Sequence, residues 1–230
     1  MSWFTDTFSS SIGRKLLVSL TGLFLISFLV IHLIGNLQLL KDDGGEAFNI
    51  YAKFMTSNPL IKTVSYLLYA SILLHAFVAL ALANKNRKAR PVGYKMSKAS
   101  ANSHWTSRSM ALLGTIVLVY IILHMKDFWY EYKFGTVGMV SYTIEGFTQE
   151  YKDLYAVVYA AFHELWIVAL YVVAMLIITF HLYHGFASAF QTLGINHKKY
   201  TPIIKTLGTI YAIVIPAAFA YIPLYIYLTK

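Results

Sequence analysis

The fold is decided by an uninterrupted apolar stretch that carries no charge, LLVSLTGLFLISFLVIHLIGNLQLL, at residues 16–40. A helix of about 20 apolar residues is long enough to cross the hydrocarbon core of a bilayer. Four further long apolar stretches lie at residues 60–83, 109–130, 154–190 and 203–228. The sequence therefore predicts an all-α membrane protein, a single domain over residues 1–230 with five transmembrane helices. The fourth stretch is longer than one crossing requires, so we expect it to begin outside the hydrocarbon.

The composition excludes an ordinary soluble domain. Hydrophobic residues make up 58% of the 230 residues and charged residues only 13%, whereas soluble domains carry about 25% charged residues. The chain has no cysteine, which excludes disulfides, thiolate metal sites, iron–sulfur clusters and covalently attached haem. Any metal must therefore be bound by oxygen or by histidine, and the chain has eight histidines.

The charged residues alternate between the connecting segments. Twelve of the 19 basic residues lie before the first stretch, between the second and third, and between the fourth and fifth, namely Arg14, Lys15, Lys85, Arg87, Lys88, Arg90, Lys95, Lys98, Arg108, Lys198, Lys199 and Lys205. Eight of the ten acidic residues lie in the other two connections, namely Asp42, Asp43, Glu46, Asp127, Glu131, Glu145, Glu150 and Asp153. Because cytoplasmic loops carry the excess of Lys and Arg, we expect a cytoplasmic N-terminus and a C-terminus outside. The net charge of +9 then reflects membrane topology and does not indicate nucleic-acid binding.

Histidines inside apolar helices indicate a functional site, because an ionisable side chain is costly in the membrane. At about 1.5 Å per residue, His32 and His124 lie roughly 25 Å from the cytoplasmic boundary, and His75 and His184 roughly 15 Å from it. Two histidines at one depth on different helices are typical of a haem with two axial imidazole ligands. The pattern predicts a four-helix core that holds two haems b. Since both axial positions are filled, oxygen has no open site and electron transfer is the expected chemistry.

Two alternatives stay open at the histidines. Each of them could instead hydrogen-bond a neighbouring carbonyl or hydroxyl group. His181 also competes with His184, because it lies one turn away on nearly the same helix face. We favour His184 as the ligand, since the following Gly185 leaves room for a flat macrocycle, and we expect His181 to be a neighbour or a propionate contact.

Small residues recur ten positions before the four predicted ligands. These residues are Gly22, Ser65, Gly114 and Ala174. Ten residues of helix span about 15 Å, which places each small side chain near the depth of the other haem. Small residues there would let a helix pass the macrocycle, although they also line ordinary helix contacts in membranes.

Short motifs flank the histidines of the first and fourth stretches. They read SIGRK at residues 11–15, LTG at 20–22, VIHLIGNL at 30–37, HLYHGF at 181–186 and QTLG at 191–194. Together with SR at residues 107–108 and His124, these segments resemble the di-haem cytochrome b membrane anchor of succinate dehydrogenase and fumarate reductase. The resemblance covers most of the chain, including the five helices and the histidines on the first four.

The resemblance implies a division of labour between subunits. It implies that His75 and His184 bind the proximal haem and that His32 and His124 bind the distal haem. It also implies a flavoprotein subunit that interconverts succinate and fumarate, and an iron–sulfur subunit, both on the cytoplasmic side of a bacterial inner membrane. This chain would anchor them among the lipids and exchange electrons with quinone, with menaquinone the expected type. The family further suggests a dimer of heterotrimers.

Polar residues on the cytoplasmic side are candidates for partner docking or for contacts with haem propionates. They are Arg14, Ser19, Arg108 and Lys198. The alternative is that the basic ones only set the topology.

The resemblance has one departure, at Leu182. Some fumarate reductases of this type have a glutamate two residues before the fourth-helix ligand, as part of a transmembrane proton path, and Leu182 makes that path doubtful here. The acid in the apolar part of the fourth stretch is Glu164, beside His163. We expect Glu164 or His163 to handle quinone protons near the outer face, with an interfacial pair that faces lipid headgroups as the alternative.

Two rival functions remain. A di-haem cytochrome b can serve another membrane dehydrogenase, such as a hydrogenase or a formate dehydrogenase, and the partner subunits would separate these cases. A transporter that uses histidines as a proton relay belongs to a different class. Transporters are typically built from repeats and broken helices, and neither is evident in the sequence.

Overall fold

The computed structural model describes residue 6, residues 10–89 and residues 104–229. The basic residues Arg90, Lys95 and Lys98 of the sequence analysis lie outside this part. Within it, five helical segments are long and apolar enough to cross a membrane, namely Ser11–Leu40, Pro59–Lys88, Met110–Phe134, Leu165–Thr192 and Thr201–Thr229. The prediction of an all-α membrane protein with five membrane-spanning helices is confirmed.

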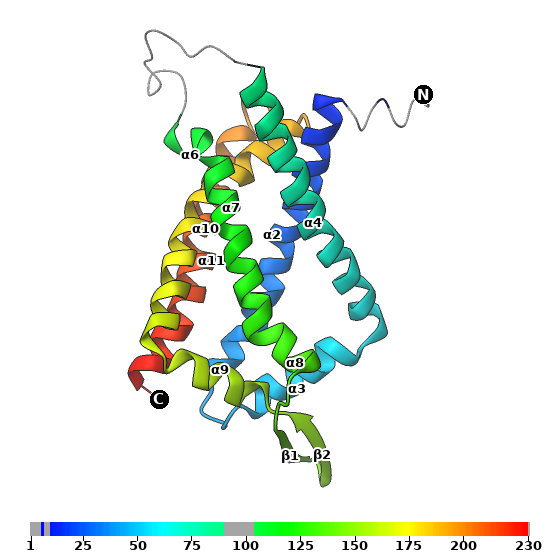
Figure 1. Ribbon diagram of the computed structural model, residues 1–230, viewed down its shortest axis with the longest axis vertical. Helices are drawn as coiled ribbons and strands as arrows, with labels where there is room; N and C mark the ends of the chain where they lie inside the picture. Colours follow the sequence, from blue (N-terminus) through cyan, green and yellow to red (C-terminus); the bar gives the residue numbers. More distant parts are fainter. Residues whose placement is uncertain (1–5, 7–9, 90–103, 230) are drawn as a thin grey trace. The chain divides into compact units, whose positions relative to one another are not determined.

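The long segments contain several elements, which Figure 1 labels. The elements, in chain order, are α2 (Ser11–Asn36) with the short 3-10 turn η1 (Leu37–Leu40), α3 (Glu46–Ser57), α4 (Pro59–Lys88), α6 (Trp105–Arg108), α7 (Met110–His124), the π-helical turn η2 (Met125–Tyr130), α8 (Glu131–Phe134), β1 (Met139–Ile144), β2 (Phe147–Lys152), α9 (Leu154–Phe162), α10 (Leu165–Thr192) and α11 (Thr201–Thr229).

Large apolar side chains are exposed along all five long segments. One example from each is Leu20, Leu67, Leu112, Leu176 and Leu207, whose exposed fractions are 56%, 58%, 63%, 58% and 56%. A soluble protein would bury such a continuous apolar surface. The exposure is expected for helices whose outer faces contact lipid, where the solvent is as apolar as the side chains.

Polar side chains begin several of these helices. The Ser10 hydroxyl accepts a hydrogen bond from the Gly13 amide at 2.9 Å. The side-chain oxygen of Asn58 accepts a hydrogen bond from the Leu60 amide at 3.0 Å. Asn58 directly precedes α4, which has proline in its first position. Such caps satisfy amide groups that the first helical turn leaves unpaired. These caps mark the helix starts at Ser11 and Pro59, whereas hydropathy placed the apolar stretches from residues 16 and 60.

The fourth predicted stretch is not one helix. It divides at His163 and Glu164, where α9 ends and α10 begins, and only α10 is long and apolar enough to span a membrane. The expectation that this stretch is longer than one span agrees with the structure, because the surplus residues form the separate short helix α9. The third stretch is instead longer than predicted at its end, since its helical segment continues through η2 and α8 as far as Phe134.

The chain divides into two compact units, and every long segment contributes to both. The first unit comprises residues 1–27, 67–117 and 177–214, and the second comprises residues 28–66, 118–176 and 215–230. Helix α2, for example, contributes residues 11–27 to the first unit and residues 28–36 to the second.

In the first unit, helices α10 and α11 approach closely. A Cβ atom on Gly208 would lie only 2.6 Å from the ring of Phe186, so glycine is required for this contact. Phe186 also packs against Tyr211, with ring centroids 5.7 Å apart. The Tyr211 hydroxyl donates to the Ile26 carbonyl, which ties α11 to α2.

The second unit has a buried apolar core. Its members are Leu33, Leu39, Phe48, Val158, Phe162, Val168, Tyr171, Ile222 and Ile226. They come from α2, η1, α3, α9, α10 and α11, so the short helices α3 and α9 pack on the same core as the long ones.

The second unit also contains a β-hairpin that the sequence analysis missed (Figure 1). Strands β1 and β2 are antiparallel, with Ile144 opposite Phe147. The two residues between them, Glu145 and Gly146, have φ values of 51° and 83°, which is typical of a tight two-residue hairpin turn. The signal in the sequence was the Glu-Gly pair between two segments rich in β-branched and aromatic residues.

Asn49 of α3 connects the hairpin to α9. Its side chain is 1% exposed, and its amide donates to the Tyr142 hydroxyl and to the Asp153 carboxylate, both at 3.0 Å. Its carbonyl oxygen accepts from the Tyr155 amide at 2.9 Å. Burial raises the pKa of the Tyr142 phenol above its usual value, so the hydroxyl stays protonated within this network.

Candidate functional site

The first unit contains a pair of facing histidines, His75 of α4 and His181 of α10. Their ring centroids are 6.4 Å apart and the ring planes are inclined by 72°. Both side chains are partly buried. The structure therefore brings together two imidazoles from different helices, as the sequence analysis anticipated, but one of the two is not the predicted residue.

His75 is held by the backbone of α2. Its Nδ1 atom lies 3.0 Å from the Val18 carbonyl oxygen and 3.2 Å from the Thr21 hydroxyl oxygen. A carbonyl can only accept a hydrogen bond, so Nδ1 must carry the proton. In the neutral ring this leaves the lone pair on Nε2, the arrangement that orients a metal-binding histidine.

Two glycines lie against this pair. A Cβ atom on Gly22 would lie 3.1 Å from Cε1 of His75, and one on Gly114 would lie 3.4 Å from Cε1 of His181. The rings therefore occupy space that any larger residue would reduce. The predicted small positions on the first and third helices do lie beside the histidines of the other pair.

The structure places His181, and not His184, opposite His75. His184 is the predicted partner of His75, but in the described part of the chain its Nε2 atom instead lies 3.1 Å from the Ser188 hydroxyl oxygen on its own helix. His181 faces His75, and its buried Nδ1 atom has no hydrogen-bond partner among the described residues. The physical reason is the rotation of α10, because two positions three residues apart point about 60° apart around a helix axis.

The second unit contains the other pair, His32 of α2 and His124 of α7. Their ring centroids are 5.7 Å apart and the planes are inclined by 84°. Aromatic rings surround them: Phe28 stacks on His32 at 5.2 Å, and Phe128 meets the edge of His124 at 5.5 Å. The structure thus brings together the two histidines that were expected to pair, among aromatic side chains.

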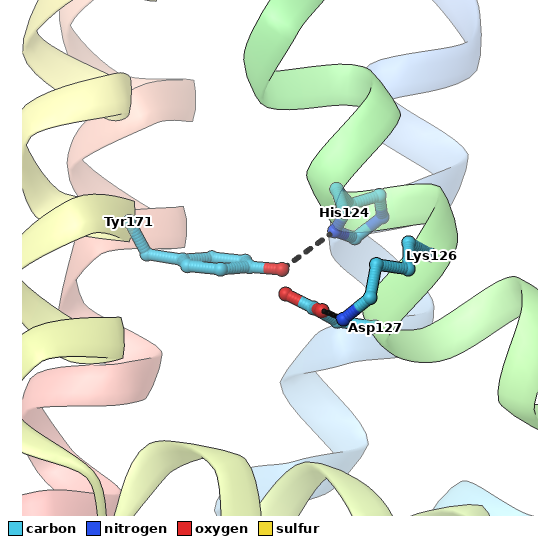
Figure 2. A network of polar contacts seen from close by, with 4 residues as sticks. All are labelled: His124, Lys126, Asp127 and Tyr171. Carbon is cyan, nitrogen blue, oxygen red and sulfur yellow. Dashed lines mark hydrogen bonds and ion pairs between the residues drawn. The ribbon is translucent and has the colours of Figure 1, made fainter.

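A polar network reaches His124 from the opposite helix (Figure 2). The Tyr171 hydroxyl of α10 lies 3.3 Å from Nδ1 of His124. The carboxylate of Asp127 on η2 lies beside this hydroxyl, and it also pairs with Lys126 at 3.2 Å. Tyr171 was not among the predicted site residues, because the ten-residue spacing was counted from His184 and not from His181.

Both pairs fit a metal bound between two imidazoles. Metal–imidazole bonds are about 2 Å long, so an ion held by two rings separates their centroids by roughly 6 Å. The observed separations of 6.4 Å and 5.7 Å agree with this value. Among the described residues, no group of three or more His, Asp or Glu side chains could hold a metal ion. Each pair could therefore supply two imidazole ligands to a metal ion.

The other residues predicted near the haems are scattered. Ser19 is buried in α2 and Arg14 is partly buried near the start of that helix, whereas Arg108 at the end of α6 and Lys198 in the turn before α11 are exposed. Within the described part, no hydrogen bond or ion pair joins the side chains of Arg14, Ser19 or Lys198 to either histidine pair.

His163 and Glu164, the predicted quinone residues, both belong to the second unit. They are exposed and lie in the break between α9 and α10. Nδ1 of His163 donates to the Tyr159 carbonyl at 2.8 Å, and its ring lies 4.2 Å from the Tyr159 ring. This contact fixes the imidazole while leaving the Glu164 carboxylate accessible.

Comparisons with protein-family models, with curated proteins and with solved structures give no significant match to this chain.

Proposed function

We propose that this chain is a di-haem cytochrome b, the membrane anchor that passes electrons between an iron–sulfur subunit and a quinone. The observation that carries the proposal is the pair of facing histidines in each unit, at ring separations of 6.4 Å and 5.7 Å. Two bis-histidine haems would supply one-electron carriers with no open position for oxygen. The succinate dehydrogenase and fumarate reductase family, which the histidine motifs resemble, uses its anchor in this way.

The ring geometry supports one set of ligands for this proposal. His75 and His181 hold one haem, and His32 and His124 hold the other. The bond from His75 to the Val18 carbonyl keeps the ring in the tautomer that binds metal through Nε2. Gly22 keeps the space beside that ring open.

The charge pattern supports the proposed partners. Basic residues between the second and third spans and between the fourth and fifth predict a cytoplasmic face, on which an iron–sulfur subunit and a flavoprotein subunit would dock. The chain itself has no cysteine for iron–sulfur ligation. Menaquinone would react at the opposite face, with His163 and Glu164 as the groups that exchange its protons.

The test is an optical spectrum and a haem count on the detergent-purified protein. We expect b-type bands in the reduced-minus-oxidised spectrum and two haems per chain. His181→Ala should remove one haem, whereas the matched variant His184→Ala, three residues away on the same helix, should retain both. His124→Ala should remove the other haem.

A colourless protein that is folded in detergent would refute the proposed function. Two haems retained in His181→Ala, together with the loss of one in His184→Ala, would return the ligand role to His184 without affecting the function itself.

A further inference from the structure

We infer that Tyr171 is a positioning residue for His124 and sets the reduction potential of the haem held in the second unit. The inference rests on the proposed function, because it concerns a haem bound at the His32–His124 pair. It adds a residue that the ligand motifs do not contain.

Tyr171 is held rigidly by aromatic rings. Its side chain is 5% exposed. Its ring centroid lies 5.2 Å from those of Tyr120 and Phe162 and 5.9 Å from that of Phe128. The three neighbours come from α7, α9 and η2, so the direction of the phenol is determined by contacts on several sides.

This packing directs the hydroxyl at His124. The Tyr171 oxygen lies 3.3 Å from Nδ1 of the imidazole, and Figure 2 shows the phenol reaching across from α10 to the ring. When Nε2 of a histidine binds a metal, Nδ1 carries the proton and donates it to a neighbouring acceptor. The Tyr171 oxygen is then that acceptor, and it orients the ring of His124.

Asp127 lies close to the acceptor. Its carboxylate lies beside the Tyr171 hydroxyl (Figure 2), and the two groups interact electrostatically. Asp127 comes from the π-helical turn that directly follows His124, and such turns are frequent at functional sites.

In each unit, Nδ1 of one histidine has a hydrogen-bond acceptor, but the acceptor group differs between the units. In the first unit the acceptor for Nδ1 of His75 is the Val18 carbonyl, a backbone group that no substitution removes. In the second unit the acceptor is a side chain, which a substitution can remove while the ring remains. A partner that accepts from Nδ1 raises the basicity of the ligand and favours the oxidised iron.

The test is Tyr171→Phe, which deletes only the hydroxyl, in the detergent-purified protein with both haems. In an optical redox titration we expect the reduction equilibrium of one haem to become more favourable by about threefold to tenfold, an upward shift of roughly 30–60 mV at 59 mV per tenfold. The other haem should keep its potential. The low-temperature electron paramagnetic resonance signal of the same haem should also change, since it reports the orientation of the axial rings.

The matched control is Tyr120→Phe. Tyr120 packs against the same imidazole, with ring centroids 5.9 Å apart, but its hydroxyl makes no hydrogen bond to His124 among the described residues. It should leave both potentials unchanged. Tyr171→Leu, measured in parallel, should shift the same haem in the same direction as Tyr171→Phe.

Unchanged potentials in both Tyr171 variants, or an equal shift of both haems, would overturn the inference while leaving the di-haem function intact. If a Tyr171 variant loses one haem, and this is the haem that His124→Ala also loses, the result would support the inference. A wild-type protein without haem would instead overturn the proposed function on which the inference rests.

Discussion

Replacing Gly22 should test the space beside His75 directly. In Gly22→Ala the new Cβ would lie 3.1 Å from Cε1 and 3.5 Å from Nδ1 of the His75 ring. Ordinary carbon–carbon contacts are about 3.5–4.0 Å, so the ring would have to retreat by roughly half an ångström. Such a retreat would stretch the 3.0 Å bond to the Val18 carbonyl to about 3.5 Å, near the limit of a hydrogen bond.

The expected magnitude follows from the cost of overpacking. One extra methyl group in a well-packed site costs about 1–3 kcal/mol, and about 1.4 kcal/mol corresponds to a tenfold change in an equilibrium constant. Gly22→Ala should therefore weaken retention of the first-unit haem by roughly fivefold to a hundredfold. Gly22→Val, which adds two further methyl groups, should leave one haem per chain.

The assay is the haem-to-protein ratio of the purified variants, followed by the rate at which haem passes to an excess of a haem-scavenging apoprotein. Gly138→Ala is the control, because its Cβ would meet no atom within 4 Å. Equal behaviour of Gly22→Ala and Gly138→Ala, or two stably bound haems in Gly22→Val, would refute the reasoning.

Two further predictions concern the second unit. Asn49→Ala should destabilise the packing of α3, the hairpin and α9 by about 2–3 kcal/mol, because it leaves buried partners such as the Tyr155 amide unpaired. Faster cleavage of the hairpin in limited proteolysis would show this loss. Ser141→Ala, at an exposed position of the same hairpin, is the control, and equal cleavage rates in the two variants would contradict the prediction. Glu164→Gln should lower quinol turnover with a soluble quinone analogue, because it removes the exposed carboxylate proposed to exchange quinone protons. Glu145→Gln is the control. Unchanged turnover in Glu164→Gln would argue that Glu164 faces lipid headgroups instead.

The number of helices and three of the four facing histidines were predictable from the sequence. Hydropathy over about 20 residues defines a span because the bilayer fixes its length, and counting residues along a helix gives depth because the rise is constant. The same counting placed Gly22 and Gly114 beside the histidines of the other pair. These are all properties of one helix at a time.

The choice between His181 and His184 was not predictable in this way. The two residues differ by only about 4.5 Å in height, so depth does not separate them, and the rotation of α10 about its own axis decides which one faces His75. That rotation is set by packing against neighbouring helices, which a single sequence does not display. The break between α9 and α10 escaped hydropathy because α9 is itself apolar and merges with the span that follows.

The position of His181 opposite His75 changes the interpretation of the ten-residue spacing. With His184 as the ligand, the residue ten positions earlier is Ala174, a small side chain like Gly22. With His181 facing His75, the residue ten positions earlier is Tyr171, which reaches His124 in the other unit. On the proposed function, α10 therefore supplies an axial ligand to one haem and the hydrogen-bond acceptor for a ligand of the other. A substitution that rotates α10 should thus perturb both haems, whereas His181→Ala and Tyr171→Phe should each perturb one.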